Sequence, residues 1–296
     1  MVSDVHGHPV LAKPSGEPSL PLFSICIPTF NGEPTIEESI RSVLDQTLTD
    51  FELIVSDDGS TDKTLSLVRD FRDPRIRVVD GPASGTAEDN WNFVVSLARG
   101  QYVKIMGQDD LLYPAALETE LMAFNSFSHQ GVVITFSKRD LITPNGNRLP
   151  RFLSRGRTFK SPSQLAEILP RVVRSGRNPL GEPVCVTFER EVFQRVDGFT
   201  GTYLIDLTTW IRILEQGPGL FIGSPQCGFR VSKSSWSYVL RRSQARQTRD
   251  FIHFLRSKYP DSVSRLDTIV GSLNATLAQL VRLLVLSVVP GKKTKE

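Results

Sequence analysis

Short apolar runs alternate with amphipathic segments along the first 110 residues of the chain. The apolar runs have the length of buried strands and end at turn-forming residues. They read FSICI (23–27), FELIVSD (51–57), RIRVVD (75–80) and QYVKIM (101–106). The segments between them place apolar residues at helical spacing, as Ile36, Ile40 and Val43 do. This repeated strand–helix alternation predicts a parallel sheet with helices on both faces.

The pattern becomes less regular in the second half of the chain. A basic segment over 138–160 reads as a loop or a hairpin with PNGN as its turn. The predicted helices cover 114–127, 161–175, 190–196, 206–217, 240–257 and 265–289, and the predicted strands cover 131–137 and 183–189. We therefore divide the chain into a flexible tail (1–21), an α/β domain (22–235) and a C-terminal helical extension (236–296).

The composition is that of an ordinary globular protein and excludes several classes. Hydrophobic residues make up 40% of the 296 positions, and the net charge of +3 is too small to indicate a nucleic-acid-binding protein. Basic clusters in 138–160 and 241–249 fit solvated faces and anionic partners equally well. The three cysteines form no CxxC pair, and the sequence shows no signal peptide and no apolar stretch of about 20 residues. These features predict a reducing, cytoplasmic compartment.

Two pairs of adjacent acids stand at the ends of predicted strands. Asp57 and Asp58 end the second strand, and Asp109 and Asp110 follow the fourth in the sequence MGQDDLLYP. Because ligands collect beyond the carboxyl ends of parallel strands, we expect all four acids at one edge of the sheet. Neighbouring carboxylates repel each other, so a cation or hydrogen-bond donors must offset them there.

The stretch SICIPTFNGEPTIEESIRSVLDQTLTDFELIVSDDGSTDKT, residues 24–64, resembles the opening of family 2 glycosyltransferases. The resemblance implies a GT-A fold, which is a Rossmann-like, mixed and mainly parallel sheet flanked by helices. The half over 22–112 would bind a nucleotide-sugar, and the half over 113–235 would bind the acceptor. Asp58 matches the acid that contacts the base and ribose of the donor, because a carboxylate accepts hydrogen bonds from ring N–H and hydroxyl groups. The resemblance also lines that pocket with Pro28, Thr29 and Asn31, whereas Asp57 either joins it or caps the following helix.

The same resemblance gives a role to MGQDDLLYP. The family often shows a D-x-D-D pattern here, of which Asp109 and Asp110 match the last two acids and Gly107 replaces the first. It implies that Asp110, with Asp109, holds a Mg²⁺ or Mn²⁺ ion, since these hard cations prefer oxygen ligands. Asp109 would also help to place the ribose or the donor sugar. Two acids instead of three leave the metal affinity open.

Three further residues follow from the resemblance. Asn92 keeps the family's spacing to Gly100 and either orients the donor or satisfies a loop backbone. Asp206 matches the catalytic base of an inverting transfer, although an acid at a helix start is by itself more often a cap. Glu182, in a Gly-Glu-Pro turn, either contacts the acceptor or donor sugar or has a structural role.

The resemblance implies a UDP-, dTDP- or GDP-sugar donor and a glycan or polyprenyl-diphosphate-linked acceptor. The Gln-x-x-Arg-Trp motif of processive synthases is missing from the sequence, which favours a single addition in O-antigen or exopolysaccharide assembly. The last predicted helix, with its lysine-rich end, fits peripheral binding to the inner face of the cytoplasmic membrane, packing in the core or a homodimer contact. Two rival functions stay open, a nucleotidyltransferase and a non-catalytic nucleotide-sugar-binding protein.

Overall fold

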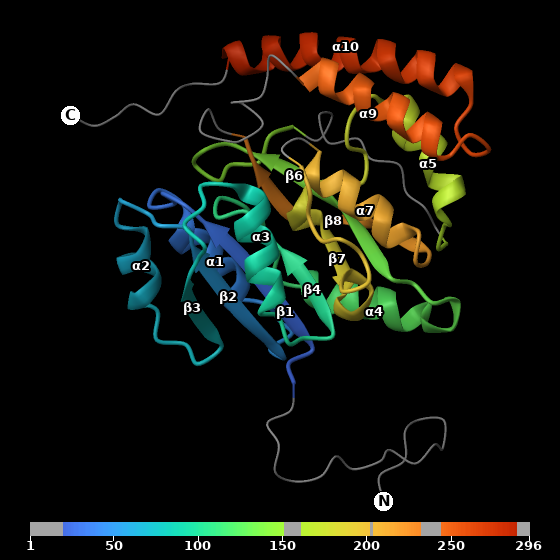
Figure 1. Cartoon of the computed structure of the whole chain (residues 1–296). Coiled ribbons are helices and arrows are strands. Elements are labelled where there is room, and N and C mark those ends of the chain that lie inside the picture. The colour runs from blue at the N-terminus through green and yellow to red at the C-terminus, as the bar shows by residue number, and fades with distance from the viewer. Residues whose placement is uncertain (1–19, 151–160, 202–203, 232–243, 289–296) are drawn as a thin grey trace, which may run out of the picture.

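The computed structural model describes residues 20–150, 161–201, 204–231 and 244–288. Its first half alternates strands and helices as predicted (Figure 1). The elements are β1 (Phe23–Thr29), α1 (Ile36–Leu44), β2 (Phe51–Asp57), α2 (Thr64–Asp70), β3 (Ile76–Asp80), α3 (Ala87–Ser96) and β4 (Tyr102–Ile105). The four strands are parallel and lie in the order β3-β2-β1-β4. The register places Thr29 beside Asp57, so β1 and β2 end at the same edge of the sheet.

The second half extends this sheet and makes it mixed. Its elements are β5 (Leu111–Leu112), α4 (Ala116–Ser126), β6 (Ile134–Ile142), α5 (Leu165–Ser175), β7 (Val186–Glu189), α6 (Arg190–Phe193), α7 (Ile205–Leu214) and β8 (Gly219–Arg230). Short 3₁₀ turns cover Ser128–Gln130 and Pro183–Cys185. The full order is β3-β2-β1-β4-β7-β6-β8-β5, in which β7 is antiparallel to β4 and to β6, and β6 is parallel to β8. The predicted mixed, mainly parallel sheet flanked by helices is confirmed.

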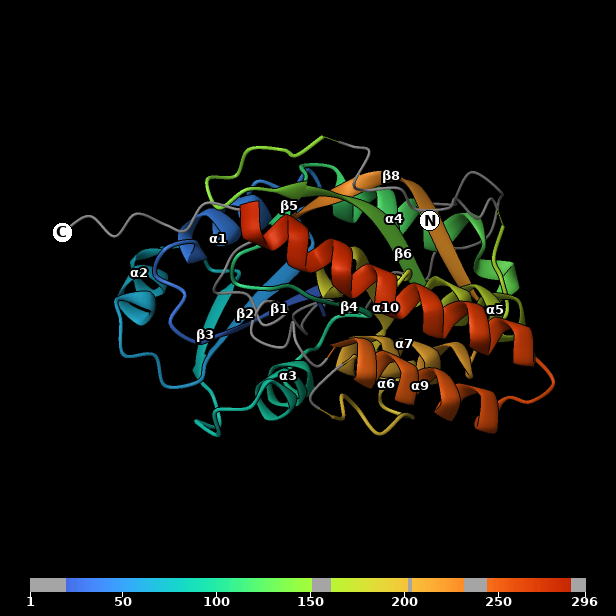
Figure 2. The ribbon, with the colours of Figure 1, turned by 90° about the horizontal axis from the view of Figure 1, so that it is seen from above.

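Helices cover both faces of the sheet. Seen from above, α1 and α4 lie on one side of the strands and α3 and α7 on the other (Figure 2). Every residue of β2 is buried, and in β1 only Pro28 is partly exposed. This two-sided burial explains why these strands read as nearly continuous apolar runs.

Two further helices, α9 (Gln244–Lys258) and α10 (Arg265–Val288), form the C-terminal extension. They pack against each other, and α10 also packs on α5. In Figure 1 the parallel strands run toward the side of the molecule on which α9 and α10 lie. No helix in the described ranges has the length and apolarity needed to cross a membrane.

The structure differs from the predicted elements chiefly around β6 and β8. The strand predicted over 131–137 continues to Ile142, so the basic segment begins inside the sheet. The predicted turn is present, because Gly146 N donates to Thr143 O (2.9 Å) and Thr143 N donates to Asn147 O (2.8 Å). Residues 151–160, the rest of that segment, lie outside the described ranges. β8 was not among the predicted strands, and it contributes residues to the candidate site.

Candidate functional site

Asp58 lies just beyond β2, in the loop that faces the end of β1. Its backbone N–H donates to Thr29 O (2.9 Å), and its Oδ2 accepts a hydrogen bond from Gly85 N (3.0 Å). The side chain is 7% exposed, and its Oδ1 is buried without a hydrogen-bond partner among the described residues. Buried carboxylate oxygens are normally satisfied, so this oxygen marks a place for an N–H or O–H donor from a ligand.

Asp57 and Asn31 tie together the two loops around Asp58. Asp57 Oδ2 accepts from Ser60 N (3.1 Å) and so closes the Asp-Asp-Gly-Ser turn; it does not cap α2. Asn31 has a left-handed backbone (φ 50°), which asparagine tolerates better than most residues. Its N–H donates to Ser60 Oγ (2.9 Å), and its Oδ1 accepts from Thr61 N (2.9 Å). These contacts fix the floor of the site around Asp58.

Gln108 joins the loop after β4 to the loop after β1. Its Oε1 accepts from Phe30 N (2.8 Å) and from the Thr29 hydroxyl, and its Nε2 donates to Phe30 O (3.0 Å). Pro28, the other residue predicted to line the pocket, pairs with Ser56 in the sheet register. No sequence pattern pointed to Gln108, because an amide that bridges two loops 78 residues apart is visible only in three dimensions.

Asp109 and Asp110 direct their carboxylates toward the same point above Gly107. A Cβ placed on Gly107 would lie 3.0 Å from Asp109 Oδ1 and 3.0 Å from Asp110 Oδ2. Burial and the neighbouring Asp109 charge raise the pKa of Asp110 well above its ordinary value, and burial also raises the pKa of Asp109. Ionisation of these two carboxyl groups is unfavourable when no cation is bound, and a cation bound between them would stabilise their ionised forms.

Arg230, at the end of β8, offsets part of this negative charge. Its backbone N–H donates to Asp110 Oδ1 (3.0 Å), and its Nε donates to Asp109 O (2.6 Å). Its side chain is 1% exposed and also binds Glu38 Oε2 (2.7 Å), which anchors the guanidinium to α1. Coulombic attraction to Arg230 moderates the rise in the pKa of Asp109. Sequence reasoning missed Arg230 because it missed the strand that carries it.

Asp206 lies in the first turn of α7, after Leu204 in a left-handed conformation (φ 54°). Its Oδ1 accepts from Leu207 N (2.7 Å), and its Oδ2 accepts from Asn178 Nδ2 (2.8 Å). Burial and the negative charge of Glu182 raise the pKa of Asp206 to about 6, although these two hydrogen bonds act in the opposite direction. Asn178 Nδ2 also donates to Gly181 O (2.9 Å) and so connects Asp206 to the Gly-Glu-Pro turn.

Glu182 forms a two-point ion pair with Arg139 of β6. The distances are 2.6 Å from Arg139 Nε to Glu182 Oε2 and 2.8 Å from Arg139 Nη2 to Glu182 Oε1. The charge of Glu182 raises the pKa of both Asp110 and Asp206. The three acids therefore share one electrostatic environment, although they come from three separate parts of the sequence.

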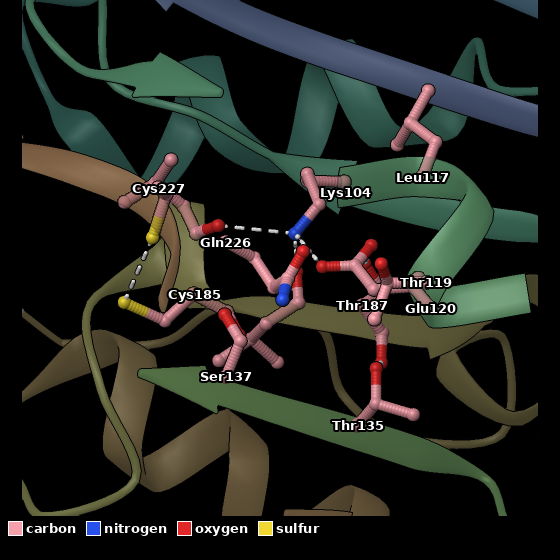
Figure 3. A network of polar contacts seen from close by, with 12 residues as sticks. Lys104, Leu117, Thr119, Glu120, Thr135, Ser137, Cys185, Thr187, Gln226 and Cys227 are labelled. Atoms are coloured by element: carbon pink, nitrogen blue, oxygen red, sulfur yellow. Dashed lines mark hydrogen bonds and ion pairs between the residues drawn. The ribbon is translucent and has the colours of Figure 1, made fainter. Parts of the chain in front are cut away.

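A buried ion pair joins β4 to α4, and its lysine also binds the segment that follows the Gly-Glu-Pro turn (Figure 3). Lys104 Nζ lies 2.9 Å from Glu120 Oε1, and neither side chain is exposed. Lys104 Nζ also donates to the carbonyls of Val184 (3.0 Å) and Val186 (3.2 Å), and Thr187 Oγ1 donates to Glu120 Oε2 (2.7 Å). These bonds connect β4, which leads into Asp109 and Asp110, with the segment that follows Glu182.

Asn92 is engaged within the fold. Its Nδ2 donates to Phe199 O (2.8 Å), and its Oδ1 accepts from Phe199 N (2.8 Å). Both bonds go to backbone groups of a loop, and pairing such groups was one of the two roles expected for this amide. Asn92 therefore positions the loop that precedes α7.

The two carboxylates after β4 fit a divalent cation only with help from a ligand. No group of three or more His, Cys, Asp or Glu residues with metal-binding geometry occurs in the described ranges. Asp109 and Asp110 do offer hard oxygen atoms that converge on one point. Mg²⁺ is commonly bound by one or two carboxylates together with substrate phosphates, so the donor set fits a metal that binds with a diphosphate.

The sequence matches a known protein family and is similar to several known proteins. A family model described as "Glycosyl transferase family 2" matches residues 24–196. An uncharacterized protein of Mycobacterium tuberculosis is 29% identical over 215 residues, which is 70% of this chain and 66%, just under two thirds, of that protein. The putative teichuronic acid biosynthesis glycosyltransferase TuaG of Bacillus subtilis is 23% identical over 248 residues, covering 81% of this chain and 92% of TuaG.

Two solved structures share the fold at low sequence identity. Residues 1–349 of S. aureus TarS in complex with UDP-GlcNAc give a TM-score of 0.56 at 19% identity, covering 81% of this chain and 73% of that one. The mannosyltransferase PcManGT from Pyrobaculum calidifontis in complex with GDP-Man and Mn²⁺ gives 0.57 at 18% identity, covering 92% and 77%. The predicted GT-A architecture is therefore confirmed.

Proposed function

Because this chain belongs to glycosyl transferase family 2, we propose that it transfers a sugar from a nucleotide-sugar to an acceptor hydroxyl with inversion at the anomeric carbon. The observation that carries the proposal is the unpartnered, buried Oδ1 of Asp58 at the strand edge where Asp109 and Asp110 also lie. A ligand that satisfies this oxygen and also brings a diphosphate toward two carboxylates has the chemistry of a nucleotide-sugar.

On this proposal Asp58 receives the donor's base or ribose. Its free oxygen accepts a ring N–H or a hydroxyl, while Gly85 holds the other oxygen in place. Thr29 and Asn31 shape the pocket through their bonds to neighbouring loops, with Pro28 in the strand beneath and Asp57 closing the turn. The amide of Asn92 is used by Phe199, so we leave it out of the donor contacts.

Asp110 and Asp109 would hold a divalent cation together with the diphosphate. When bound, such an ion would stabilise the charge that develops on the departing nucleotide. The Arg230 guanidinium keeps the two carboxylates in position by binding the backbone of Asp109. Mg²⁺ and Mn²⁺ both fit oxygen ligands of this kind.

Asp206 is the proposed catalytic base. With a pKa of about 6 it is mostly ionised at neutral pH and is still basic enough to take a proton. Asn178 and Leu207 use one lone pair on each oxygen and orient the carboxylate. The acceptor hydroxyl passes its proton to Asp206 as its oxygen bonds to the anomeric carbon and the nucleoside diphosphate departs from the opposite face. Glu182 has its carboxylate held by Arg139, and its proposed role is to line the sugar pocket and to sustain the raised pKa of Asp206.

The proposed setting is a single addition in cell-surface polysaccharide assembly, in the cytoplasm, on a glycan or polyprenyl-diphosphate-linked acceptor. The name of the relative TuaG, a putative teichuronic acid biosynthesis glycosyltransferase, supports this setting. The donor classes to examine are UDP-, dTDP- and GDP-sugars; the TarS and PcManGT structures are complexes with UDP-GlcNAc and GDP-Man respectively.

The test measures donor binding and nucleoside diphosphate release with a panel of these sugars and Mn²⁺. We expect one donor to raise the thermal stability of the protein and to release its nucleoside diphosphate. Asp58→Asn should weaken donor binding, whereas Asp70→Asn, at an exposed position on α2, should leave it unchanged. Donor binding without release, even with candidate acceptors, would identify a non-catalytic binding protein, and pyrophosphate release would identify a nucleotidyltransferase.

A further inference from the structure

Over residues 265–281, where its side chains are described, helix α10 has its largest apolar residues on the outside. Its buried positions in this range are occupied by small or polar residues, namely Asp267, Thr268, Gly271 and Ala275. Six large apolar side chains, between 49% and 67% exposed, form the outer face of α10: Leu266, Ile269, Leu273, Leu277, Leu280 and Val281. A helix that serves only the core of its own chain shows the opposite arrangement.

Small residues face inward because the backbones of α10 and α5 approach each other closely. A Cβ on Gly271 would overlap Val173 O, and a Cβ on Gly176, which ends α5 with a positive φ, would overlap the backbone of Ala275. Polar contacts complete this interface, with an ion pair between Arg174 and Asp267 and a hydrogen bond from Asn274 Nδ2 to Arg174 O (2.7 Å).

Polar contacts also attach α10 to α9. Ala245 N donates to Gln279 Oε1 (2.8 Å), and Arg249 Nη1 donates to Thr276 Oγ1 (3.1 Å). The helix is thus held in the fold by its inner face and its flanks. The outer face contributes little to this packing, and contiguous exposed apolar surface of this kind usually marks an interaction site.

The charge of the surrounding sequence indicates what the outer face binds. Residues 240–296 contain eleven lysines and arginines against four acids, whereas the whole chain contains 35 against 32. The side chain of Arg246 on α9 is 83% exposed, and Lys292, Lys293 and Lys295 follow α10 in the sequence. An apolar stripe in a basic part of the sequence matches a surface of acyl chains and anionic headgroups. A second copy of the same face would bring like charges together, which opposes self-association.

We propose that the outer face of α10 docks this protein on an anionic lipid surface. The helix lies in the plane of the interface, with Leu266, Leu273, Leu277 and Leu280 among the upper acyl chains and the exposed basic residues of the described part, such as Arg246, near the headgroups. The parallel strands run toward the same side of the molecule as α10 (Figure 1), so docking places the sheet edge at which β2 ends, next to Asp58, on the membrane side. The proposal stands independently of sugar transfer, because lipid binding requires no donor.

Flotation of the full chain with vesicles tests the proposal. We expect binding to vesicles of phosphatidylcholine and phosphatidylglycerol in equal amounts, and weaker binding to phosphatidylcholine alone or at high salt. The double substitution Leu273→Gln and Leu277→Gln should lower the partition coefficient by at least about tenfold, because it removes two apolar side chains from the interface. The matched control is Met122→Gln on α4, which alters a side chain of similar exposure (63%) and should leave the partition unchanged.

The outcomes are distinct. The Leu273→Gln, Leu277→Gln protein should unfold at the wild-type temperature, and it should release nucleotide from the donor at the wild-type rate when no vesicles are present. Failure of the wild-type chain to bind phosphatidylglycerol vesicles, or equal binding by the double variant, would overturn the proposal. A dimer in sedimentation experiments that the double substitution dissociates would overturn it as well, by showing that a second copy covers the face.

Discussion

Asp206 is ionised at neutral pH against the preference of its surroundings, and Asp206→Asn removes that charge. The pKa of Asp206 rises from 3.8 to about 6 in the fold, because burial, the largest cause, and the charge of Glu182 both raise it. The folded protein therefore keeps a proton on this carboxyl at pH values where the unfolded chain has already released it. As the pH rises from about 4 to about 6, ionisation of Asp206 therefore lowers the free energy of unfolding of the wild-type protein.

The size of the effect follows from the same shift. Each pKa unit corresponds to about 1.4 kcal/mol, so ionised Asp206 destabilises the fold by about 3 kcal/mol at pH 8. The side chain keeps some contact with solvent, which reduces this figure. Asparagine also loses one good acceptor for Leu207 N, at about 1 kcal/mol. We expect Asp206→Asn to be more stable than the wild type by about 1–2 kcal/mol at pH 8.

The assay is urea unfolding of both proteins at several pH values from 4 to 8. The stability difference isolates Asp206, because every other titrating group is common to the two proteins. At pH 4 the free energy of unfolding of the variant should equal that of the wild type or be slightly lower. The advantage of the variant should then grow through about pH 6 and level off above it. Sugar transfer by the same variant should fall by about 10²–10⁴-fold, the usual contribution of a general base.

Two results would refute this reasoning. A difference in stability that stays flat from pH 4 to pH 8 would mean that Asp206 is not strained in its ionised form. Near-normal transfer by a folded Asp206→Asn protein would remove Asp206 as the base, whatever the stability measurements show. A gain in stability combined with a loss of transfer is the signature of a catalytic carboxylate that the fold holds at a free-energy cost.

Three further predictions concern the surroundings of the site. Lys104→Met should destabilise the protein by about 3–5 kcal/mol in urea unfolding, because it leaves Glu120 charged and buried, and adding Glu120→Leu should recover much of the loss. Asn178→Ala removes a hydrogen bond that lowers the pKa of Asp206, so the rising limb of the pH profile of kcat/KM should move above pH 6 while the protein stays folded. Chelation with EDTA should stop nucleotide release, and Asp109→Asn should raise the Mn²⁺ concentration needed for half-maximal rate; full activity in EDTA would contradict the metal assignment.

The first half of the fold was predictable from the sequence because its signals are local. β1 and β2 are apolar runs buried on both faces, and the helices after them carry an apolar stripe. β8 escaped prediction because Gly223, Ser224 and Pro225 interrupt its pattern, and proline inside a sheet is normally confined to edges and irregularities. The structure places a register shift between β6 and β8 near Pro225, which is how the strand continues through it. Such a strand is defined by its partner and not by its own sequence.

The acids of the site could be predicted, whereas the residues that hold them could not. Asp58, Asp109 and Asp110 stand just beyond predicted strands, where sequence pattern and family resemblance both indicate them, whereas Asp206 was named by the resemblance alone. The groups that position them, Gln108, Asn178 and Arg230, act across separations of 28 to 121 residues. Lys104 is a further case, because a lysine in a strand normally reaches solvent, and only the fold brings Glu120 to it.

The absence of a third acid before Asp109 is consistent with the charge balance of the site. Asp109 and Asp110 already converge on the backbone of Gly107, and a side chain there would begin 3.0 Å from an oxygen of each carboxylate. One buried guanidinium, that of Arg230, binds this loop, and it shares its donors with Glu38 and two backbone carbonyls. A third carboxylate would add repulsion to a pair whose pKa values are already raised, and Arg139, whose charge also interacts with Asp110, is already paired with Glu182. Gly107 therefore leaves room for both carboxylates to converge, and on the proposed function a cation bound with the donor diphosphate would complete their neutralisation.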